Sequence, residues 1–377
     1  MSYNPIKPVL DYCTAHQIAH GAFNVNSPCQ ALDIIKALER IRSAAIIQVA
    51  EPGLALIAGN PDFLKGTMEE KDKGAKIIAS ATIGHAKEAS IPVVLHLDHG
   101  RSFESCKFCI DAGFSSVMID GSVLPYEENV AVTKKVVDYA HKFGVSVEGE
   151  LEVLSGVEDN VFADNSTYTN PMLVVDFISK THLDSLAISY GTKHGAVKGD
   201  NVKLRKEIAI ASLENLRHSG LVCDLVSHGS SLVPQYIIEE INELGGKVGG
   251  HGIPMEQLKE VIPCGISKIN MDTDIRLASF RNVLEYFVDH PEKRDSKIFK
   301  LIEAKPEAFD YRYFLTPILS ELQGAKIDTE ESFIMKELLA RAVDEIVIPA
   351  SVSFGDVGDA DFINPQSLEQ MKEIYSR

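Results

Sequence analysis

One run of the chain reads Val93-Val94-Leu95-His96-Leu97-Asp98-His99-Gly100, a short apolar and β-branched stretch that ends in polar and charged side chains. Similar apolar runs recur along the 377 residues, and longer stretches with helical periodicity separate most of them. Eight strand–helix units in succession predict parallel pairing and a closed sheet. We therefore expect an α/β fold, namely a TIM (β/α)8 barrel.

The predicted strands lie near Gly21–Val25, Ala45–Val49, Val93–Leu97, Ser116–Ile119, Val145–Glu150, Ser185–Ser189, Leu221–Ser227 and Ser267–Met271. Predicted helices between them include Asn26–Ile41, Lys71–Ala89, Tyr126–Phe143 and Pro171–Thr181. A doubly wound open sheet is the alternative, but that fold usually has fewer strands and a glycine-rich turn after the first one. Here the first strand runs into Asn24-Val25-Asn26-Ser27, without a G-x-G-x-x-G pattern.

A single domain is expected over residues 1–350, with a helical extension that begins at about Arg276. The glycine-rich run Gly245–Gly252 lies between the last two predicted strands. It has neither Walker nor Rossmann spacing, so a loop is favoured over a phosphate cradle. Residues 351–377 form a polar, acidic tail that is expected to pack on a neighbour or to stay loose.

Composition argues against several classes of partner. The formal net charge is −17 at pH 7, whereas a broad nucleic-acid surface needs clustered Lys and Arg. We find no secretory signal at the amino terminus and no apolar segment long enough to span a bilayer. Cys106 and Cys109 lie on one face of a predicted helix, where buried free thiols are favoured over a redox or metal pair. We expect a reducing, cytoplasmic setting with no nucleic-acid or membrane partner.

Histidines stand where three of the predicted strands end. His99 follows strand three, His194 follows strand six and His228 follows strand seven. In a barrel the carboxyl ends of the strands share one face, so these side chains are expected to converge there. One such histidine alone is more often structural, but three from different strands can form an open zinc site. Glu150, at the end of strand five, is either a fourth ligand or a solvated charge.

Glycines and small polar residues follow the last three strands. These residues are Gly195, Lys198 and Gly199 after strand six, Gly229 and Ser231 after strand seven, and Asn270, Asp272 and Thr273 at the end of strand eight. Loops after strands seven and eight recur as phosphate sites in barrels, through backbone N–H groups and hydroxyls. Ordinary turn chemistry is the alternative, because the same residue types favour turns.

In order along the chain, these motifs resemble the class II fructose-bisphosphate aldolase family, from about residue 5 to residue 320. The matching stretches are Ala22-Phe23-Asn24-Val25-Asn26, Leu95-His96-Leu97-Asp98-His99-Gly100, Val117-Met118-Ile119-Asp120-Gly121-Ser122, Val147-Glu148-Gly149-Glu150-Leu151, Gly156-Val157-Glu158-Asp159, Gly191-Thr192-Lys193-His194-Gly195, His228-Gly229-Ser230-Ser231 and Lys268-Ile269-Asn270-Met271-Asp272-Thr273-Asp274. The insertion Pro234–Ile262 resembles a long-loop branch of that family.

The resemblance implies a metal centre. His99, His194 and His228 would hold a catalytic zinc ion, and Glu150 would be an alternate ligand. The metal would act as a Lewis acid that polarises the ketose carbonyl and stabilises the enediolate. The resemblance also allows another divalent metal in place of zinc, and a monovalent cation.

The resemblance assigns proton transfer to two carboxylates. Asp98 would carry the proton of the C4 hydroxyl, and Glu158, on a mobile loop, would exchange the carbon-bound proton. Two separate acid–base tasks explain why two carboxylates are needed. Asp120 and Asn24 would be supporting polar groups. Closure of the loop over the intermediate would exclude water.

The substrate implied by the resemblance is a phosphorylated ketose. The glycines and polar residues after strands six to eight, with Lys198 among them, would hold its triose phosphate. Phe309–Leu315 resembles the family's FDPR segment, so Arg312 would bind the far anionic end of the substrate, as part of the same or a neighbouring subunit. The resemblance suggests a homodimer or a homotetramer.

Departures from the family pattern cluster at the rim. Ala50 stands where many members have Ser, Arg101 follows a motif that usually continues with a small residue, and Lys193 adds a charge. We expect that the reaction is retained and that the aldehyde half of the substrate differs, with another anion such as a sulfonate or a differently configured sugar phosphate. Neutral drift explains any single change equally well.

Three competing functions remain. A metal-dependent hydrolase on the same barrel would also use histidines around zinc, but it needs an activated water and a general base. A non-catalytic sugar-phosphate sensor would not require both Asp98 and Glu158. A Schiff-base aldolase could use Lys268 on strand eight, although it would not need three metal-binding histidines.

Overall fold

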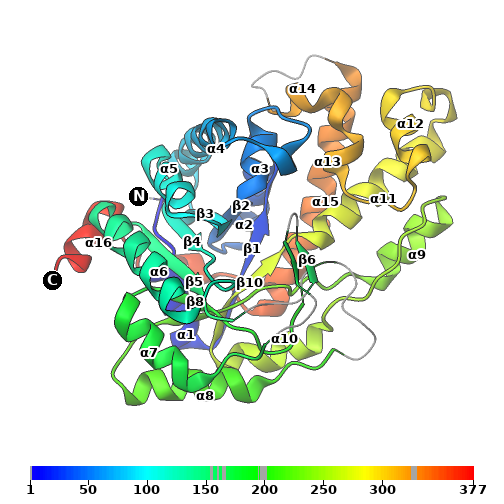
Figure 1. Ribbon diagram of the computed structural model, residues 1–377. Helices are drawn as coiled ribbons and strands as arrows, with labels where there is room; N and C mark the ends of the chain where they lie inside the picture. The colour runs from blue at the N-terminus through cyan, green and yellow to red at the C-terminus, as the bar shows by residue number, and fades with distance from the viewer. Residues whose placement is uncertain are drawn as a thin grey trace.

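The computed structural model describes residues 2–152, 156–158, 161–163, 167–193, 195, 202–323 and 329–377. Eight parallel strands form a closed barrel in the order β1-β10-β9-β8-β5-β4-β3-β2, with helices around it (Figure 1). The strands are β1 (His20–Asn24), β2 (Ala45–Ala50), β3 (Val93–Gly100), β4 (Ser116–Ile119), β5 (Ser146–Glu150), β8 (Ser185–Ala187), β9 (Asp224–Ser227) and β10 (Ile266–Met271). Each overlaps a predicted strand, so the predicted (β/α)8 barrel is confirmed. A separate antiparallel pair consists of β6 (Gly156–Glu158) and β7 (Val161–Ala163).

The strands that depart most from the predicted bounds are β3, β8 and β9. β8 ends at Ala187 and not at Ser189. β3 continues to Gly100, and its pairing with β4 shifts register between Leu97 and Gly100. β9 begins at Asp224 and not at Leu221. The apolar residue Val222 is 71% exposed, because the chain is still in the connection after α8, outside the sheet.

Helices cover the outside of the barrel. In chain order they are α1 (Lys7–His16), α2 (Pro28–Ile41), α3 (Glu51–Ile57), α4 (Met68–Glu88), α5 (Phe103–Ala112), α6 (Tyr126–Ala140), α7 (Pro171–Thr181), α8 (Lys206–His218), α9 (Gln235–Glu243), α10 (Met255–Val261), α11 (Thr273–Asp289), α12 (Lys297–Ala304), α13 (Tyr311–Phe314), α14 (Leu319–Gln323), α15 (Glu330–Phe354) and α16 (Leu368–Tyr375). Thr67 and Glu70 form a reciprocal capping box that fixes the start of α4. Cys106 and Cys109 on α5 are buried free thiols. No helix in the described ranges combines the length and apolar character needed to cross a membrane.

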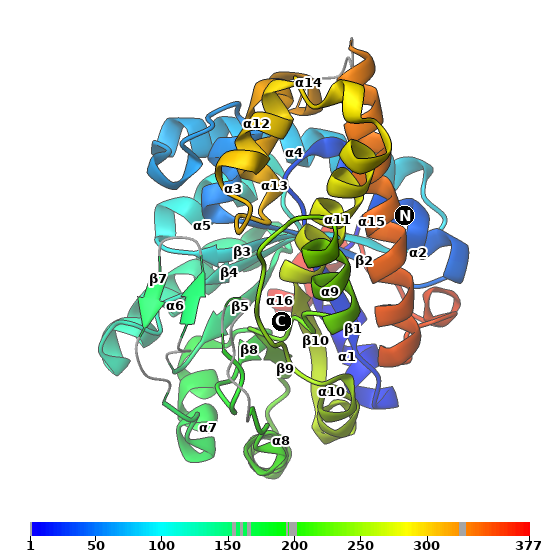
Figure 2. The same cartoon turned by 90° about the vertical axis from the view of Figure 1, so that its right-hand side faces the viewer.

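The carboxyl-terminal part of the chain packs along the barrel. α11 and α15 lie side by side, and α15 also packs on α2 (Figure 2). α15 continues to Phe354, so the helical extension runs past its predicted end at about residue 350. The following segment packs on its own barrel and is not loose. Tyr375 stacks on His141 with ring centroids 3.6 Å apart, and its hydroxyl donates to Asp184 over 2.8 Å.

Candidate active site

The end of β3 turns two consecutive side chains toward the same site. Successive residues of a strand normally point to opposite faces. At the end of β3 the pairing with β4 is irregular, and His99 takes the left-handed backbone conformation with φ 48°. Both Asp98 and His99 are therefore buried among side chains from other barrel strands. A left-handed backbone is uncommon for a residue other than glycine, and such strain is often found at functional sites.

Three amide side chains surround the carboxylate of Asp98. Asn24 on β1 donates to Oδ2 over 3.0 Å, and Asn270 on β10 donates to Oδ1 over 3.1 Å. The Gln48 side-chain amide on β2 lies 3.4 Å from Oδ2 and donates to the side-chain oxygen Oδ1 of Asn24 over 2.6 Å. Three strands thus fix the orientation of one carboxylate. Gln48 was missed in the sequence, where its only signal is an amide inside an otherwise apolar strand.

Two of the predicted metal ligands meet directly. Nε2 of His99 lies 2.8 Å from Nδ1 of His228, and the two rings are nearly perpendicular. The outer nitrogens contact carboxylates: His99 Nδ1 lies 2.9 Å from Asp120, and His228 Nε2 lies 2.7 Å from Glu148. A carboxylate on the far nitrogen is the usual support of a metal-binding histidine, because it fixes the tautomer and the ring orientation. Both inner nitrogens are thereby aimed at one point.

This geometry fits a divalent cation. Ligand nitrogens of a tetrahedral zinc ion lie about 3.3 Å apart, so the two inner nitrogens would need to separate by roughly 0.5 Å. Burial lowers the pKa of His228, which favours the neutral imidazole. Carboxylate oxygens stand close by: Asp98 Oδ1 lies 4.0 Å from His99 Nε2, and Glu150 Oε2 lies 3.8 Å from His99 Nδ1. Asp98, His99 and His228 together offer three donor atoms within 4.8 Å of one another.

A buried chain of polar groups stands behind His228. Glu148 accepts a hydrogen bond from Lys268 over 2.8 Å, and the Lys268 ammonium also lies 3.4 Å from His96. All three side chains are fully buried. Burial alone would raise the pKa of Glu148, but the Lys268 ammonium, helped by His228, holds it well below the usual range. Lys268 is therefore an ion-pair partner in this structure, which disfavours it as the nucleophile of a Schiff-base mechanism.

Comparisons with known proteins identify the family of this chain. A model of the family described as fructose-bisphosphate aldolase class-II matches residues 4–321. The chain belongs to the class II fructose-bisphosphate aldolase family. Members of this family are lyases. The chain is 36% identical to the fructose-bisphosphate aldolase of Giardia intestinalis over 372 residues, which cover 98% of each chain. It is 33% identical to that of Pseudomonas aeruginosa, over all of this chain and 98% of the relative.

Solved structures show the same fold. The YdjI aldolase from Escherichia coli K12 matches with a TM-score of 0.64 at 23% identity, over 95% of this chain and 99% of that chain. A fructose-bisphosphate aldolase from Campylobacter jejuni matches with a TM-score of 0.67 at 22% identity, over 95% and 97%. At these identities the structural similarity supports the fold of this class II aldolase family member, and the fold alone.

The predicted phosphate residues lie around the ends of β9 and β10. Gly229 has φ 61° and Ser231 is buried in the connection after β9. Asp272 directly precedes α11, and Thr273 is the first residue of that helix. The Asp272 carboxylate forms an ion pair with Arg276, so Asp272 would have to meet a phosphate through its backbone.

Arg312 lies on α13, where it shares one carboxylate with Arg276. Its guanidinium pairs with Asp310 over 2.8 Å and stands 4.5 Å from the centre of the Phe63 ring. Arg276 contacts the same Asp310 carboxylate over 3.1 Å. Burial alone would raise the pKa of Asp310, but Arg276 and Arg312 hold it well below its usual range. A substrate anion would therefore compete with Asp310 for Arg312.

Other predicted site residues are placed less completely. His194 and Lys198 lie outside the described residues, as does the Glu158 side chain, whose backbone belongs to β6. Gly195 has φ 83°, and Lys193 is exposed. Of the specificity candidates, Ala50 is the register partner of Asp98 in the β2–β3 pair. Arg101 is exposed, and its backbone N–H donates to Glu51 over 2.8 Å.

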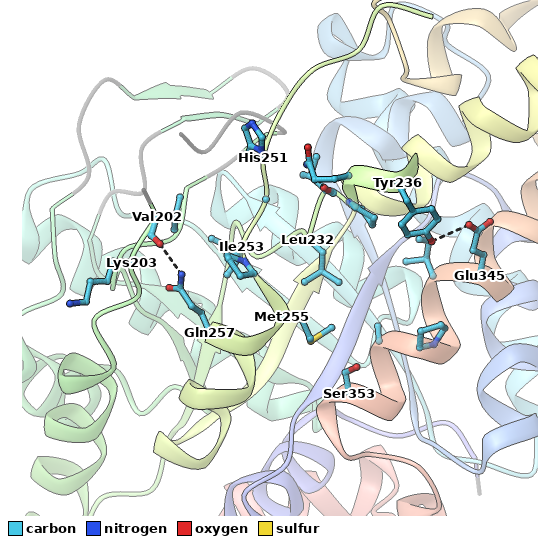
Figure 3. Close-up of a pocket in the computed structure, with 18 residues that line it drawn as sticks. Val202, Lys203, Leu232, Tyr236, His251, Ile253, Met255, Gln257, Glu345 and Ser353 are labelled. Carbon is cyan, nitrogen blue, oxygen red and sulfur yellow. Dashed lines mark hydrogen bonds between the residues drawn. The ribbon is translucent and has the colours of Figure 1, made fainter. Parts of the chain in front are cut away.

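A cavity of about 960 Å³ opens beside the connection that follows β9 (Figure 3). α9, α10 and α15 contribute to its walls, where Tyr236 bonds Glu345 over 3.1 Å and Gln257 bonds the Val202 carbonyl over 2.8 Å. Asp98, His99 and His228 do not line this cavity. It is thus separate from the cluster that carries the candidate chemistry.

Proposed function

We propose that this chain is a divalent-metal-dependent aldolase. It reversibly cleaves a ketose 1-phosphate or 1,6-bisphosphate into dihydroxyacetone phosphate and an aldehyde. The observation that carries the proposal is the facing pair of inner nitrogens of His99 and His228, beside the oriented carboxylate of Asp98. Membership of the class II aldolase family supports the same reaction.

The metal site would consist of His99 and His228, completed by His194 and with Glu150 as an alternate ligand. Asp120 and Glu148 would hold the two described histidines in the tautomers that leave their inner nitrogens available. A zinc ion bound there supplies a Lewis acid that polarises the ketose carbonyl.

Asp98 would act on the C4 hydroxyl of the substrate. It accepts the hydroxyl proton as the C3–C4 bond breaks, and it returns the proton to the aldehyde oxygen in the reverse direction. The amides of Asn24, Gln48 and Asn270 orient its carboxylate for this transfer. Glu158 would exchange the carbon-bound proton of the triose half. These are the two acid–base tasks that the cleavage requires.

The triose phosphate would bind where β9 and β10 end. The left-handed Gly229, the Ser231 hydroxyl and the amino terminus of α11 bring backbone N–H groups and a hydroxyl to this region. The aldehyde half would extend past Ala50, which neighbours Asp98 in register and offers a methyl group in place of a hydroxyl. We infer that the far end of the substrate differs from that of fructose 1,6-bisphosphate, for example as a sulfonate.

The test is retro-aldol cleavage of a panel of ketose 1-phosphates, including the 1,6-bisphosphate and a sulfonated analogue. Released dihydroxyacetone phosphate is coupled to a dehydrogenase, with and without a chelator. Cleavage that disappears on chelation and returns with zinc is expected, and the preferred substrate identifies the aldehyde half. Zinc bound without any cleavage would overturn the aldolase proposal in favour of a hydrolase or a sensor. Near-diffusional efficiency on fructose 1,6-bisphosphate would overturn the altered specificity alone.

A further inference from the structure

A second cluster of metal-binding residue types lies at the amino-terminal end of the barrel strands. His20 is the first residue of β1, and Cys13 lies on α1. Asp356 and Asp359 come from the segment that follows α15. All four side chains are at most 4% exposed. The cluster is at the opposite end of β1 from Asn24, the residue that contacts Asp98.

Both nitrogens of the His20 ring face carboxylates. Nε2 lies 2.5 Å from Asp359 Oδ2, and Nδ1 lies 3.2 Å from Asp356 Oδ2. The second oxygen of Asp359 accepts the Ala44 backbone N–H over 3.3 Å. One donor atom each from Cys13, His20 and Asp359 lies within 4.8 Å of the other two.

We propose that Cys13, His20 and Asp359 bind a second divalent cation of the zinc type, and that Asp356 orients His20 from outside the coordination sphere. A thiolate, an imidazole nitrogen and a carboxylate oxygen are the three donor types that zinc takes in proteins. Ligand atoms around such an ion lie about 3.3–3.8 Å apart, so His20 Nε2 and Asp359 Oδ2, now 2.5 Å apart, would need to separate. Asp356 would then support the ring as Asp120 and Glu148 support the catalytic histidines.

The gathering of a thiol and two carboxylates around one buried imidazole favours a metal over a simple hydrogen-bonded cluster. Apart from the His20 Nδ1 contact at 3.2 Å, the buried Asp356 carboxylate has no hydrogen-bond partner in the described part of the chain. Buried carboxylates without partners are costly. A divalent cation would balance the negative charge of these buried acidic groups. It would bind Cys13, His20 and Asp359 directly, with Asp356 acting through the His20 ring, and the thiol proton would be released to solvent.

The ligand positions give the site a structural role. Cys13 and His20 lie near the start of the sequence, and Asp359 lies near its end. Cross-linking residues so far apart restricts the unfolded chain over nearly its whole length, and closing a long loop gives the largest entropic stabilisation. The ion would attach the segment after α15 to the amino-terminal end of the barrel strands.

The test uses the full chain loaded with Co²⁺ alone and with Zn²⁺ alone. The described ligands of the catalytic site are histidines and carboxylates, so a thiolate-to-cobalt charge-transfer band in the near ultraviolet reports the second site. We expect this band, two metal ions per chain at saturation, and loss of both the band and one ion in Cys13→Ser. Cys109→Ser, which removes another fully buried free thiol, should change neither.

A further variant separates this site from the catalytic one. His228→Ala should lose the catalytic ion and keep the charge-transfer band. Wild-type protein that binds one Co²⁺ ion per chain without the band would overturn the second site and leave a hydrogen-bonded cluster. The Co²⁺ stoichiometry is measured on the wild-type protein, so it does not depend on the folding of a variant. Its failure would not bear on the proposed aldolase function.

Discussion

The two ends of the barrel use the same residue types in opposite ways. At the carboxyl end, His99 and His228 each have a carboxylate on the outer nitrogen and aim the inner nitrogen at a common point. At the amino end, both nitrogens of His20 face carboxylates, and the segment after α15 covers the ring. The comparison indicates that the placement of acceptors around an imidazole decides its role. A histidine with one nitrogen turned to a common point can serve a substrate site, whereas a histidine enclosed by acceptors on both sides serves the structure. Substitutions at the open end should reduce function, and substitutions at the closed end should change stability.

Asp98→Asn is the substitution with the largest expected effect. General acid–base catalysis by one side chain contributes about 10²–10⁴-fold, so kcat for cleavage should fall by about that factor. The substitution keeps the size of the side chain but removes its ability to take a proton. Steady-state kinetics on the preferred ketose phosphate, with metal content measured on the same sample, test the expectation.

Asp138→Asn on α6 is the matched control, since Asp138 is exposed and pairs only with Lys134 among the contacts described. It should leave kcat unchanged. A variant at Asp98 that binds metal fully and retains more than a tenth of wild-type kcat would remove Asp98 from the proton transfer. Loss of both metal and activity would instead assign Asp98 to the metal site.

Asp120→Asn and Glu148→Gln both remove the charge from a carboxylate that supports a metal-binding histidine. Loss of such an outer partner typically weakens metal affinity about 10–100-fold, and competition with a chelator should show this for both variants. The two should differ in stability. Glu148→Gln also leaves the buried Lys268 ammonium without its carboxylate, and breaking a buried ion pair costs about 3–5 kcal/mol.

Denaturant unfolding of the two metal-free variants checks the difference. Asp120→Asn should remain near the wild-type free energy of unfolding, since Asp120 contacts His99 and Ser122 and no described lysine or arginine. Equal stability of the two variants would mean that Lys268 finds another partner or loses its charge. Unchanged metal affinity in both would contradict the role of these carboxylates in orienting the histidines.

The sequence predicts the barrel well because its strands and helices are each marked by a local pattern, namely β-branched apolar runs for the strands and helical periodicity for the helices. Asp98, His99 and His228 could also be predicted from the sequence, because each lies at or next to the end of a strand and the barrel topology brings those ends together. The contact of Glu148 with His228 and that of Lys268 with Glu148 were not predicted, because the sequence of a strand does not reveal what its polar side chains face across the barrel. Only the register of the closed sheet supplies that information.

The amino-terminal cluster was not predicted at all. Its histidine and its two carboxylates are more than 330 residues apart in sequence, and no spacing motif connects them. The tail that carries Asp356 and Asp359 has a polar, acidic composition that also fits a loose end. The contacts of its helix α16 with the barrel, through Tyr375, His141 and Asp184, arise from tertiary packing. Long-range packing of this kind is outside the reach of local patterns.

Asp224→Asn should leave catalysis and metal binding at the open end unchanged, and its effect should be confined to the pH dependence of stability at the closed end. Asp224 begins β9 and accepts a hydrogen bond from Thr14 over 2.6 Å. Burial and the Asp11 carboxylate raise the pKa of Asp224 to about 8, although the Lys7 ammonium and Thr14 oppose the shift. Asp184 is a further acidic group close to Lys7. The folded chain therefore holds a proton on Asp224 that the unfolded chain releases above about pH 4.

Because the folded state binds more protons in this range, the contribution of Asp224 to stability is complete below about pH 4 and declines as the pH rises through 8. Asn cannot ionise, so the variant should match wild type near pH 4 and become progressively more stable than wild type as the pH rises to 8. Urea unfolding at several pH values measures the difference. Parallel stability curves for the two proteins would mean that Asp224 stays ionised beside Lys7. The amino end would then hold an ionised carboxylate near Lys7, as the carboxyl end holds Glu148 beside Lys268.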